Sequence, residues 1–476
     1  MQIYKASYRP AAIAAHRNNP LIEALPEYVE WMPRQVLAKL SERPESPSAV
    51  ASRTQCAAWL NKLPTNFFVP AKRHYALFAT IDLLIRKGYD LRNPLTVGRA
   101  EYLDNARERL QSAGKTANFA EQAQEQLTVS LIGAPGTGKT RSLERILSMY
   151  PQLIEHSREQ NGGPFLQITS LRVECPREGG VNALCRGILA EVDRLTGNSC
   201  KERIHITDRT PLETLKSTLV QILAVHYVGI IVIDEIQNLF SNSKESEALF
   251  NFVVNLSHAL RVPFLFVGTP KVYEFLTGNA HTARYFGTHG LVRWEPLSRG
   301  SREWETFVTE LWRCSMLRQD PEVIPKEIED KLFACSFGIV EILLKLYVLA
   351  QNRILYLTAR RHDATERRLT AETIEHVFHG YFETVEPILA KLHKGERKAL
   401  LELEGIVPPA SLKEAASQMR AEISNEAGDE AVAEDELRRS DVKSAIAGSL
   451  QYAGNDLPPV AQKIARDLVK MLAAVC

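Results

Sequence analysis

The stretch Gly133-Ala-Pro-Gly-Thr-Gly-Lys-Thr140 constrains this chain more than any other feature of its sequence. It fits the pattern G-x-x-x-x-G-K-[ST], the phosphate-binding loop of nucleoside triphosphatases. Glycines let backbone N–H groups curve around phosphate oxygens, and the N-terminus of a following helix favours an anion. An apolar run at 127–132 precedes the loop and a helix-like segment at 140–147 follows it. These flanking segments argue against the alternative, which is a chance glycine-rich turn.

The loop predicts both ATP and Mg²⁺ as cofactors. Lys139 should reach the β- and γ-phosphates, and the hydroxyl of Thr140 should ligate the metal ion. The residues expected to bind the nucleotide are Gly133, Ala134, Pro135, Gly136, Thr137, Gly138, Lys139, Thr140 and Arg141.

A second apolar run, at 228–233, ends in Asp234 and Glu235. Its β-branched residues without polar breaks are typical of a parallel strand that is covered on both faces. A carboxylate at the tip of such a strand, beside the phosphate loop, is well placed for Mg²⁺. We therefore expect Asp234 to act on the metal, mostly through water, and Glu235 to polarise the attacking water. Taken alone, the pair would also fit a solvated turn.

Two further residues are catalytic candidates. Thr269 follows the strand-like run 263–267 and occupies the sensor-1 position, from which it can contact the γ-phosphate or the lytic water. Because Pro270 comes next, Thr269 also fits a helix N-cap, and both roles can hold. Arg284 is the candidate arginine finger for a neighbouring subunit's γ-phosphate, with Arg293 as its rival and a solvated surface arginine as the alternative.

Strand-like and helix-like segments alternate through the middle of the chain. Strands are expected at 127–132, 165–174, 228–234, 263–268 and 291–295, and helices at 140–150, 181–196, 211–226 and 244–260. This alternation predicts an α/β fold with a parallel sheet and helices on both of its faces. A P-loop NTPase core of this kind followed by a small helical lid, expected at 299–395, is what an AAA+ ATPase has. If strand 263–268 inserts between strands 127–132 and 228–234, the sheet belongs to the class with a strand-tip glutamate. The sequence leaves that order open.

Composition shifts divide the chain into four predicted segments. They are a helical N-terminal extension (1–126), the AAA+ core (127–298), a small helical lid (299–395) and a C-terminal tail (396–476). The tail carries an acidic run at 429–436 and a short amphipathic pattern at 459–472. It fits either a disordered end or a segment that docks a partner.

The predicted lid departs from the usual AAA+ pattern at one position. Many AAA+ proteins have an arginine, called sensor 2, three residues after a glycine in this region. Here Gly338 is followed by Glu341 at the corresponding place. The missing positive charge predicts slow, regulated hydrolysis.

Bulk properties of the 476 residues exclude several classes. The formal net charge of +1 gives no overall nucleic-acid signature, so any basic surface must be local. Arg172, Arg177 and Asn182 are weak candidates for DNA binding, with solvated surface charge as the alternative for each. The start of the sequence lacks a signal-peptide pattern, and no apolar run is long enough to span a membrane. These observations predict a cytoplasmic protein without a membrane partner.

Four blocks of the sequence together resemble one family. They are Asn19-Pro-Leu-Ile-Glu-Ala-Leu-Pro26, the phosphate loop, Val232-Ile-Asp-Glu-Ile-Gln237 and Val267-Gly-Thr-Pro-Lys271. Together they are similar to the TnsC/TniB family of AAA+ regulators, most of all its TnsC branch, from Tns-type DNA transposons that include CRISPR-associated ones. The N-terminal block restricts the resemblance to this one family, because the other three blocks are specific only to P-loop ATPases in general.

The resemblance implies an ATP-dependent regulator of transposition in the bacterial cytoplasm. Such proteins form homo-oligomeric rings or filaments on double-stranded DNA, which they contact through the backbone, largely independently of sequence. They link a target selector, TnsD or a TniQ-type protein, to the transposase subunits TnsA/TnsB and activate insertion. It also implies that the C-terminal region engages the transposase.

Two other functions stay open at this stage. One is a helicase loader or replication initiator, which should carry a dedicated DNA-reading module such as a helix-turn-helix. The loosely patterned tail does not resemble one. The other is a DNA-coating scaffold in which ATP joins the subunits and hydrolysis has no role.

Overall fold

The structure is a computed structural model of the whole chain. It describes residues 2–27, 33–45, 52–96, 101–102, 104, 127–157, 164–178, 180–197, 209–241, 243–273, 290–317, 323–360, 368–403 and 412–425. The described residues form two compact units. The first, which we call the sheet unit, comprises 1–41, 70–296 and 397–405; the second, the helical unit, comprises 42–69, 297–396 and 406–476.

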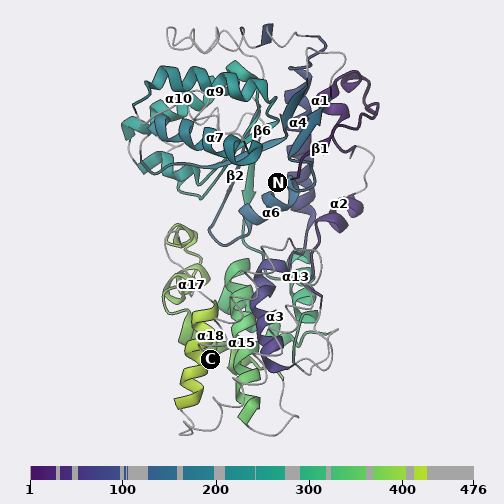
Figure 1. Cartoon of the computed structure of the whole chain (residues 1–476). Coiled ribbons are helices and arrows are strands. Elements are labelled where there is room, and N and C mark those ends of the chain that lie inside the picture. The colour runs from purple at the N-terminus through teal and green to yellow at the C-terminus, as the bar shows by residue number, and fades with distance from the viewer. Residues whose placement is uncertain are drawn as a thin grey trace, which may run out of the picture. The chain divides into compact units, whose positions relative to one another are not determined.

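The sheet unit is built on five parallel strands (Figure 1). Their order is β5 (Ser170–Glu174), β6 (Ile230–Asp234), β7 (Phe264–Gly268), β2 (Thr128–Gly133) and β8 (Leu291–Trp294). Strand β7 thus lies between the strand of the phosphate loop and the strand that ends in Asp234. The predicted α/β fold with a parallel sheet is confirmed, and the order that the sequence left open is the one with a strand-tip glutamate.

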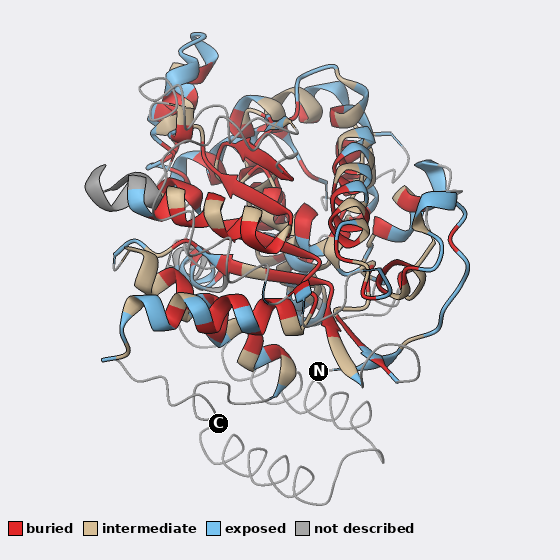
Figure 2. Cartoon of the chain, turned by 90° about the horizontal axis from the view of Figure 1, so that it is seen from above, coloured by how far each residue is buried: buried red, intermediate tan, exposed pale blue. Residues whose placement is uncertain are grey.

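Helices cover both faces of this sheet. On one face, α7 (Gly180–Thr196) packs against β5 and against α9 (Leu212–Val225) and α10 (Ser243–Leu260). On the other, α4 (Lys72–Asp90) packs against β6 and α6 (Lys139–Leu147), and Figure 1 shows the two groups on either side of the strands. Strands β2, β6 and β7 are buried at every residue, whereas the helices expose their outer faces (Figure 2). Burial on both faces explains why these strands read as unbroken apolar runs.

The single strand expected at 165–174 is wrong, because two strands occupy that range. Strand β4 (Phe165–Ile168) pairs with β3 (Leu153–His156), which also pairs with β1 (Tyr4–Lys5) in a separate three-stranded sheet. The chain changes sheets at Thr169, whose N–H donates to the carbonyl of Gln152 and whose hydroxyl donates to that of Pro151. Periodicity did not show this break, because apolar residues recur on both sides of Thr169, at 165, 166 and 168 and again at 171 and 173.

The N-terminal block of the resemblance anchors the start of the chain. Asn19 caps α1 (Pro20–Glu23) by accepting a hydrogen bond from the N–H of Leu21, at 3.1 Å. Its Nδ2 donates to the carbonyl of Tyr89 on α4, at 2.9 Å, and the Leu21 carbonyl accepts from Gln167 of β4. Asn19 and Leu21 are almost completely buried. The block therefore joins α1 to α4 and to the small sheet. Helix α2 (Pro33–Leu40) follows it in the chain.

The helical unit centres on the long helix α15 (Val340–Arg360). It packs against α3 (Arg53–Asn66), α14 (Lys326–Ser336), α16 (Ala371–Tyr381) and α18 (Leu412–Asn425), while α13 (Arg302–Arg313) and α17 (Glu386–His393) complete the unit. The expected helical character of 299–395 is confirmed for the described residues. Helix α3 comes from the predicted N-terminal extension, so this unit takes residues from both sides of the sheet unit in the sequence. The acidic run and the amphipathic pattern of the tail lie outside the described residues.

Candidate nucleotide-binding site

The phosphate loop joins β2 to α6 in the conformation that its glycines permit. Gly136 and Gly138 have φ angles of 72° and 89°, in the left-handed region where a side chain is strained. Gly133 is required for a different reason, since a Cβ there would lie 2.1 Å from the carbonyl oxygen of Trp294 on β8. A Cβ at Gly138 would meet no atom within 4 Å, so the backbone of the loop is uncovered at that point.

Lys139 is folded onto this loop. Its ammonium donates to the carbonyls of Gly133 and Ala134, at 2.7 and 2.8 Å, and the side chain is almost completely buried. The hydroxyl of Thr137 also donates to the Ala134 carbonyl. These contacts hold the lysine against the loop where the sequence predicts phosphate oxygens. Pro135 and Arg141 are half-buried beside it.

The two predicted metal ligands lie next to each other. The hydroxyl of Thr140 is 3.3 Å from Oδ2 of Asp234, although the residues are 94 positions apart. The other carboxylate oxygen, Oδ1, accepts a hydrogen bond from the N–H of Glu235, at 2.9 Å. A hydroxyl and a carboxylate oxygen are hard donors of the kind that Mg²⁺ prefers. The donor set at the end of β6 therefore fits the predicted ion.

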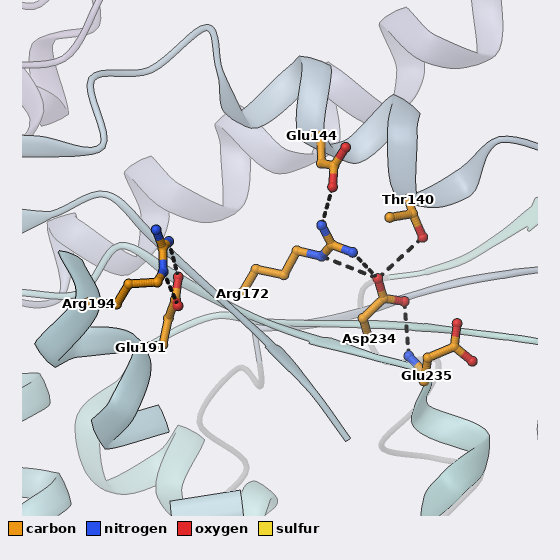
Figure 3. A network of polar contacts seen from close by, with 7 residues as sticks. All are labelled: Thr140, Glu144, Arg172, Glu191, Arg194, Asp234 and Glu235. Carbon is orange, nitrogen blue, oxygen red and sulfur yellow. Dashed lines mark hydrogen bonds and ion pairs between the residues drawn. The ribbon is translucent and has the colours of Figure 1, made fainter. Parts of the chain in front are cut away.

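Arg172 joins this cluster, which the sequence did not predict (Figure 3). It lies on β5, beside β6, and its Nη2 and Nε donate to Asp234 Oδ2 at 2.8 and 3.3 Å. Its Nη1 donates to Glu144 on α6. Arg172 was expected as a DNA contact; in the structure its guanidinium is held by the carboxylate of the candidate metal site. Sequence reasoning missed the pairing because only the strand order brings β5 beside β6.

Glu235 has an unusual backbone conformation. Its φ of 54° lies in the left-handed region, which is uncommon for a residue with a side chain and is found at functional sites. Partial burial, and then the nearby charge of Asp234, raises the pKa of its carboxyl above the ordinary value. A carboxylate with a raised pKa is a better proton acceptor, as the predicted role requires.

Gln237 connects Glu235 to the next strand. Its Nε2 donates to the Glu235 carboxylate, and its Oε1 accepts from the N–H of Thr269, at 3.1 Å. A Cβ on Gly268 would come within 2.9 Å of that same oxygen, so glycine leaves room for the bridge. Thr269 itself is buried at the tip of β7. Sequence reasoning did not predict this role for Gln237, and the available signal is its position two residues after Glu235.

The remaining predicted residues are more dispersed. Arg293 is exposed on the edge strand β8, and Arg284 lies outside the described residues. Arg177 is exposed after β5, and the side-chain oxygen of Asn182 accepts from Arg186 on the same helix, at 2.6 Å. In the helical unit, the Glu341 carboxylate accepts a hydrogen bond from Lys345 at 2.7 Å, so the acidic residue that we expect at the sensor-2 position is held in an ion pair.

The described residues contain neither a candidate membrane span nor a cluster of metal-ligating side chains. None of the described helices is long and apolar enough to cross a membrane. The described histidines, cysteines and acidic residues form no group of three or more that could hold a metal ion, so a Thr–Asp pair remains the metal candidate.

Comparison with known proteins identifies the middle of the chain. Residues 122–276 match the family described as AAA domain. A search of curated proteins finds no match.

Among solved structures, the chain is similar to the ORC1 protein of Aeropyrum pernix in complex with DNA, at 15% identity and a TM-score of 0.34 over 69% of this chain and 83% of that one. It is also similar to Drosophila ORC bound to DNA, at 11% identity and a TM-score of 0.36 over 82% and 92% of the two chains. The AAA-domain match and the order of the five-stranded parallel sheet together give the chain an AAA+ P-loop fold.

Proposed function

We propose that this chain is an ATPase that regulates DNA transposition. The observation that carries the ATPase is the meeting of Lys139, Thr140, Asp234 and Glu235 around one phosphate loop. The link to transposition rests on the resemblance of the four sequence blocks to the TnsC/TniB family. In this proposal the chain assembles on double-stranded DNA, receives a target selector of the TnsD or TniQ type and activates the TnsA/TnsB transposase.

Each residue of the site has a distinct task. Lys139 leaves the loop carbonyls and binds phosphate oxygens, while Thr140 and Asp234 hold Mg²⁺, Asp234 mostly through water. The bound ion neutralises charge on the phosphates. Glu235 accepts a proton from the attacking water, and Gln237 keeps that carboxylate beside the tip of β7. Gln237 is thus a positioning residue, whereas Thr269 contacts the γ-phosphate or the water.

Assembly completes the site in this proposal. Arg284, or Arg293 in its place, reaches the γ-phosphate of a neighbouring subunit, so hydrolysis depends on the ring or filament. The acidic Glu341, in place of a sensor-2 arginine, keeps hydrolysis slow. The C-terminal tail docks the transposase, and the protein works on DNA in the bacterial cytoplasm.

The first experiment is DNA binding in three nucleotide states. Purified protein is mixed with duplex DNA and ATP, a non-hydrolysable analogue or ADP, and read by gel shift and negative-stain microscopy. We expect rings or filaments with ATP and the analogue but none with ADP. Absence of assembly in every state, with and without a target selector, would contradict the proposed DNA-bound regulator.

A second experiment separates a regulated switch from a scaffold. Glu235→Gln should keep ATP and DNA binding while hydrolysis falls by about 100-fold or more, since one proton acceptor contributes ~10²–10⁴-fold. Reconstituted transposition by the variant should then lose target discrimination or disassembly. Normal transposition by this variant would instead favour ATP acting only to join subunits. Loading of a replicative helicase onto DNA, with no effect on transposition, would favour the initiator alternative.

A further inference from the structure

The Arg172 ion pair occupies the metal side of Asp234. Oδ2 is the oxygen that faces Thr140, the other predicted Mg²⁺ ligand, and it accepts both contacts from the arginine. Oδ1 is already bonded to the backbone N–H of Glu235. The positive charge of the guanidinium therefore lies at the carboxylate oxygen through which Asp234 would act on the ion.

We propose that Arg172 is a cationic placeholder for Mg²⁺. In the metal-free protein it neutralises Asp234, and it competes with the ion for the charge of that carboxylate. The proposal rests on the nucleotide site of the proposed function and adds a residue that regulates metal entry.

Burial makes a placeholder necessary. The Asp234 side chain is only 6% exposed, and an ionised carboxylate removed from water is costly unless it is paired. Thr140 and the Glu235 N–H supply neutral donors, and Arg172 supplies the charge. Removing the arginine takes this charge away from the carboxylate until Mg²⁺ arrives.

Arg172 also has a second partner that retains it when the ion binds. Glu144 on α6 accepts from its Nη1 and is 56% exposed, while the arginine side chain is 33% exposed. The guanidinium can therefore shift toward Glu144 and solvent without becoming an unpaired buried charge. Because two positive charges repel, Mg²⁺ bound at Asp234 weakens the Arg172 ion pair, and the ion pair weakens the binding of Mg²⁺.

The chain contains a matched control. Arg194 on α7 makes a two-bond ion pair with Glu191, at 2.7 Å for each contact, and its side chain is 60% exposed. Figure 3 draws this pair with no contact to the Asp234 cluster. Arg194→Met therefore removes the same charge and the same kind of pair without touching the site.

The test compares Arg172→Met with Arg194→Met in two measurements. Binding of a fluorescent ATP analogue is titrated with Mg²⁺, and thermal unfolding is followed in EDTA and in Mg²⁺ without nucleotide. For Arg172→Met we expect half-maximal binding at a Mg²⁺ concentration roughly three- to tenfold lower than in the wild type, since a nearby charge partner of this exposure couples modestly. Its melting temperature in EDTA should fall by about 2–4 °C, and Mg²⁺ should restore part of that loss. Arg172→Lys, which keeps the charge, should lie between the two.

Several results would overturn the placeholder. One is an unchanged Mg²⁺ requirement together with an EDTA melting temperature equal to that of Arg194→Met. Another is a higher Mg²⁺ requirement, which would mean that Arg172 helps to place Asp234 for the ion. If the wild-type chain binds no nucleotide at any Mg²⁺ concentration, the proposed function fails. The melting curves in EDTA and Mg²⁺ then still decide whether Arg172 and the ion compete.

Discussion

Each compact unit holds a buried glutamine whose side-chain oxygen accepts a hydrogen bond from a backbone N–H. In the sheet unit, Gln237 accepts from Thr269 at 3.1 Å. In the helical unit, Gln351 accepts from Met316 at 2.8 Å and from the hydroxyl of Ser315. The two oxygens therefore do the same work, which is to satisfy a backbone group that would otherwise be unpaired.

The nitrogens of the two glutamines distinguish the regions. Nε2 of Gln237 donates to the carboxylate of Glu235, whereas Nε2 of Gln351 has no partner among the described residues. The contacts of Gln237 thus hold groups that a nucleotide, water or metal ion would use. Those of Gln351 hold the backbone N–H of Met316 and the Ser315 hydroxyl. We therefore expect substitution of Gln237 to change ligand handling and substitution of Gln351 to change stability.

The largest effect should come from Lys139→Ala. Its ammonium is the positive charge of the phosphate loop, so its loss should weaken ATP binding by about 100-fold or more, equivalent to ~2.7 kcal/mol. Isothermal titration calorimetry measures this directly. The melting temperature without nucleotide should change little, and ATP affinity within tenfold of the wild type would contradict the assignment of the loop.

The next largest effect should be on stability, from Gln351→Leu. Met316 then loses the acceptor of its N–H, which should cost about 1–3 kcal/mol of the free energy of unfolding of the helical unit. Urea denaturation followed by circular dichroism measures the change. The affinity for ATP should stay within about twofold of the wild type, because Gln351 is not a residue of the nucleotide site. A large loss of affinity would erase the distinction between the two glutamines.

Gln237→Leu sharpens the same comparison from the other side. Without its bridge, the Glu235 carboxylate loses its hydrogen bond, so kcat for ATP hydrolysis should fall by about tenfold while KM changes little. Steady-state kinetics with Gln237→Glu as a second variant separates positioning from packing, because the glutamate keeps the acceptor for Thr269 but repels Glu235. Equal kcat values for wild type and Gln237→Leu would remove the positioning role.

A further effect should be a pH dependence of stability that originates at His74. This histidine lies in the first turn of α4, accepts from the N–H of Ala71 at 2.8 Å and contacts the ring of Trp294. Burial, and then the charge of Arg73, lowers its pKa to about 3 from the ordinary value of 6.5. Between about pH 6.5 and 3, His74 is therefore protonated in the unfolded chain but neutral in the folded chain.

The sign of the pH effect follows from that difference. The contribution of His74 is fully present above about pH 6.5, the unfolded pKa, and is lost as the pH falls toward 3, by at most ~1.4 kcal/mol per pH unit. His74→Gln keeps an acceptor for the Ala71 N–H but does not titrate. The difference in urea midpoint between the wild type and this variant should shift between pH 7.5 and 5.0, and a constant difference would refute the assignment.

Much of the sheet unit was predictable because its signals are local. The phosphate loop, the buried strand before Asp234 and the strand before Thr269 are each written in fewer than about ten consecutive residues, and the helices between them follow apolar periodicity. The split of 165–174 was missed for the complementary reason. The chain passes from one sheet to the other at Thr169, which bonds to the carbonyls of residues 151 and 152. No residue next to Thr169 in the sequence signals this break.

What the sequence by itself determined is the chemistry at each strand tip: a lysine and a hydroxyl after one strand, two carboxylates after another. Only the tertiary structure decided which of these tips are neighbours. Placing β7 between β2 and β6 aligned Gln237 with Thr269, and placing β5 beside β6 brought Arg172 to Asp234, 62 residues away. The physical reason is that strand order is set by how helices and apolar faces pack across the whole sheet, whereas motif chemistry is set by residues that adjoin in the chain.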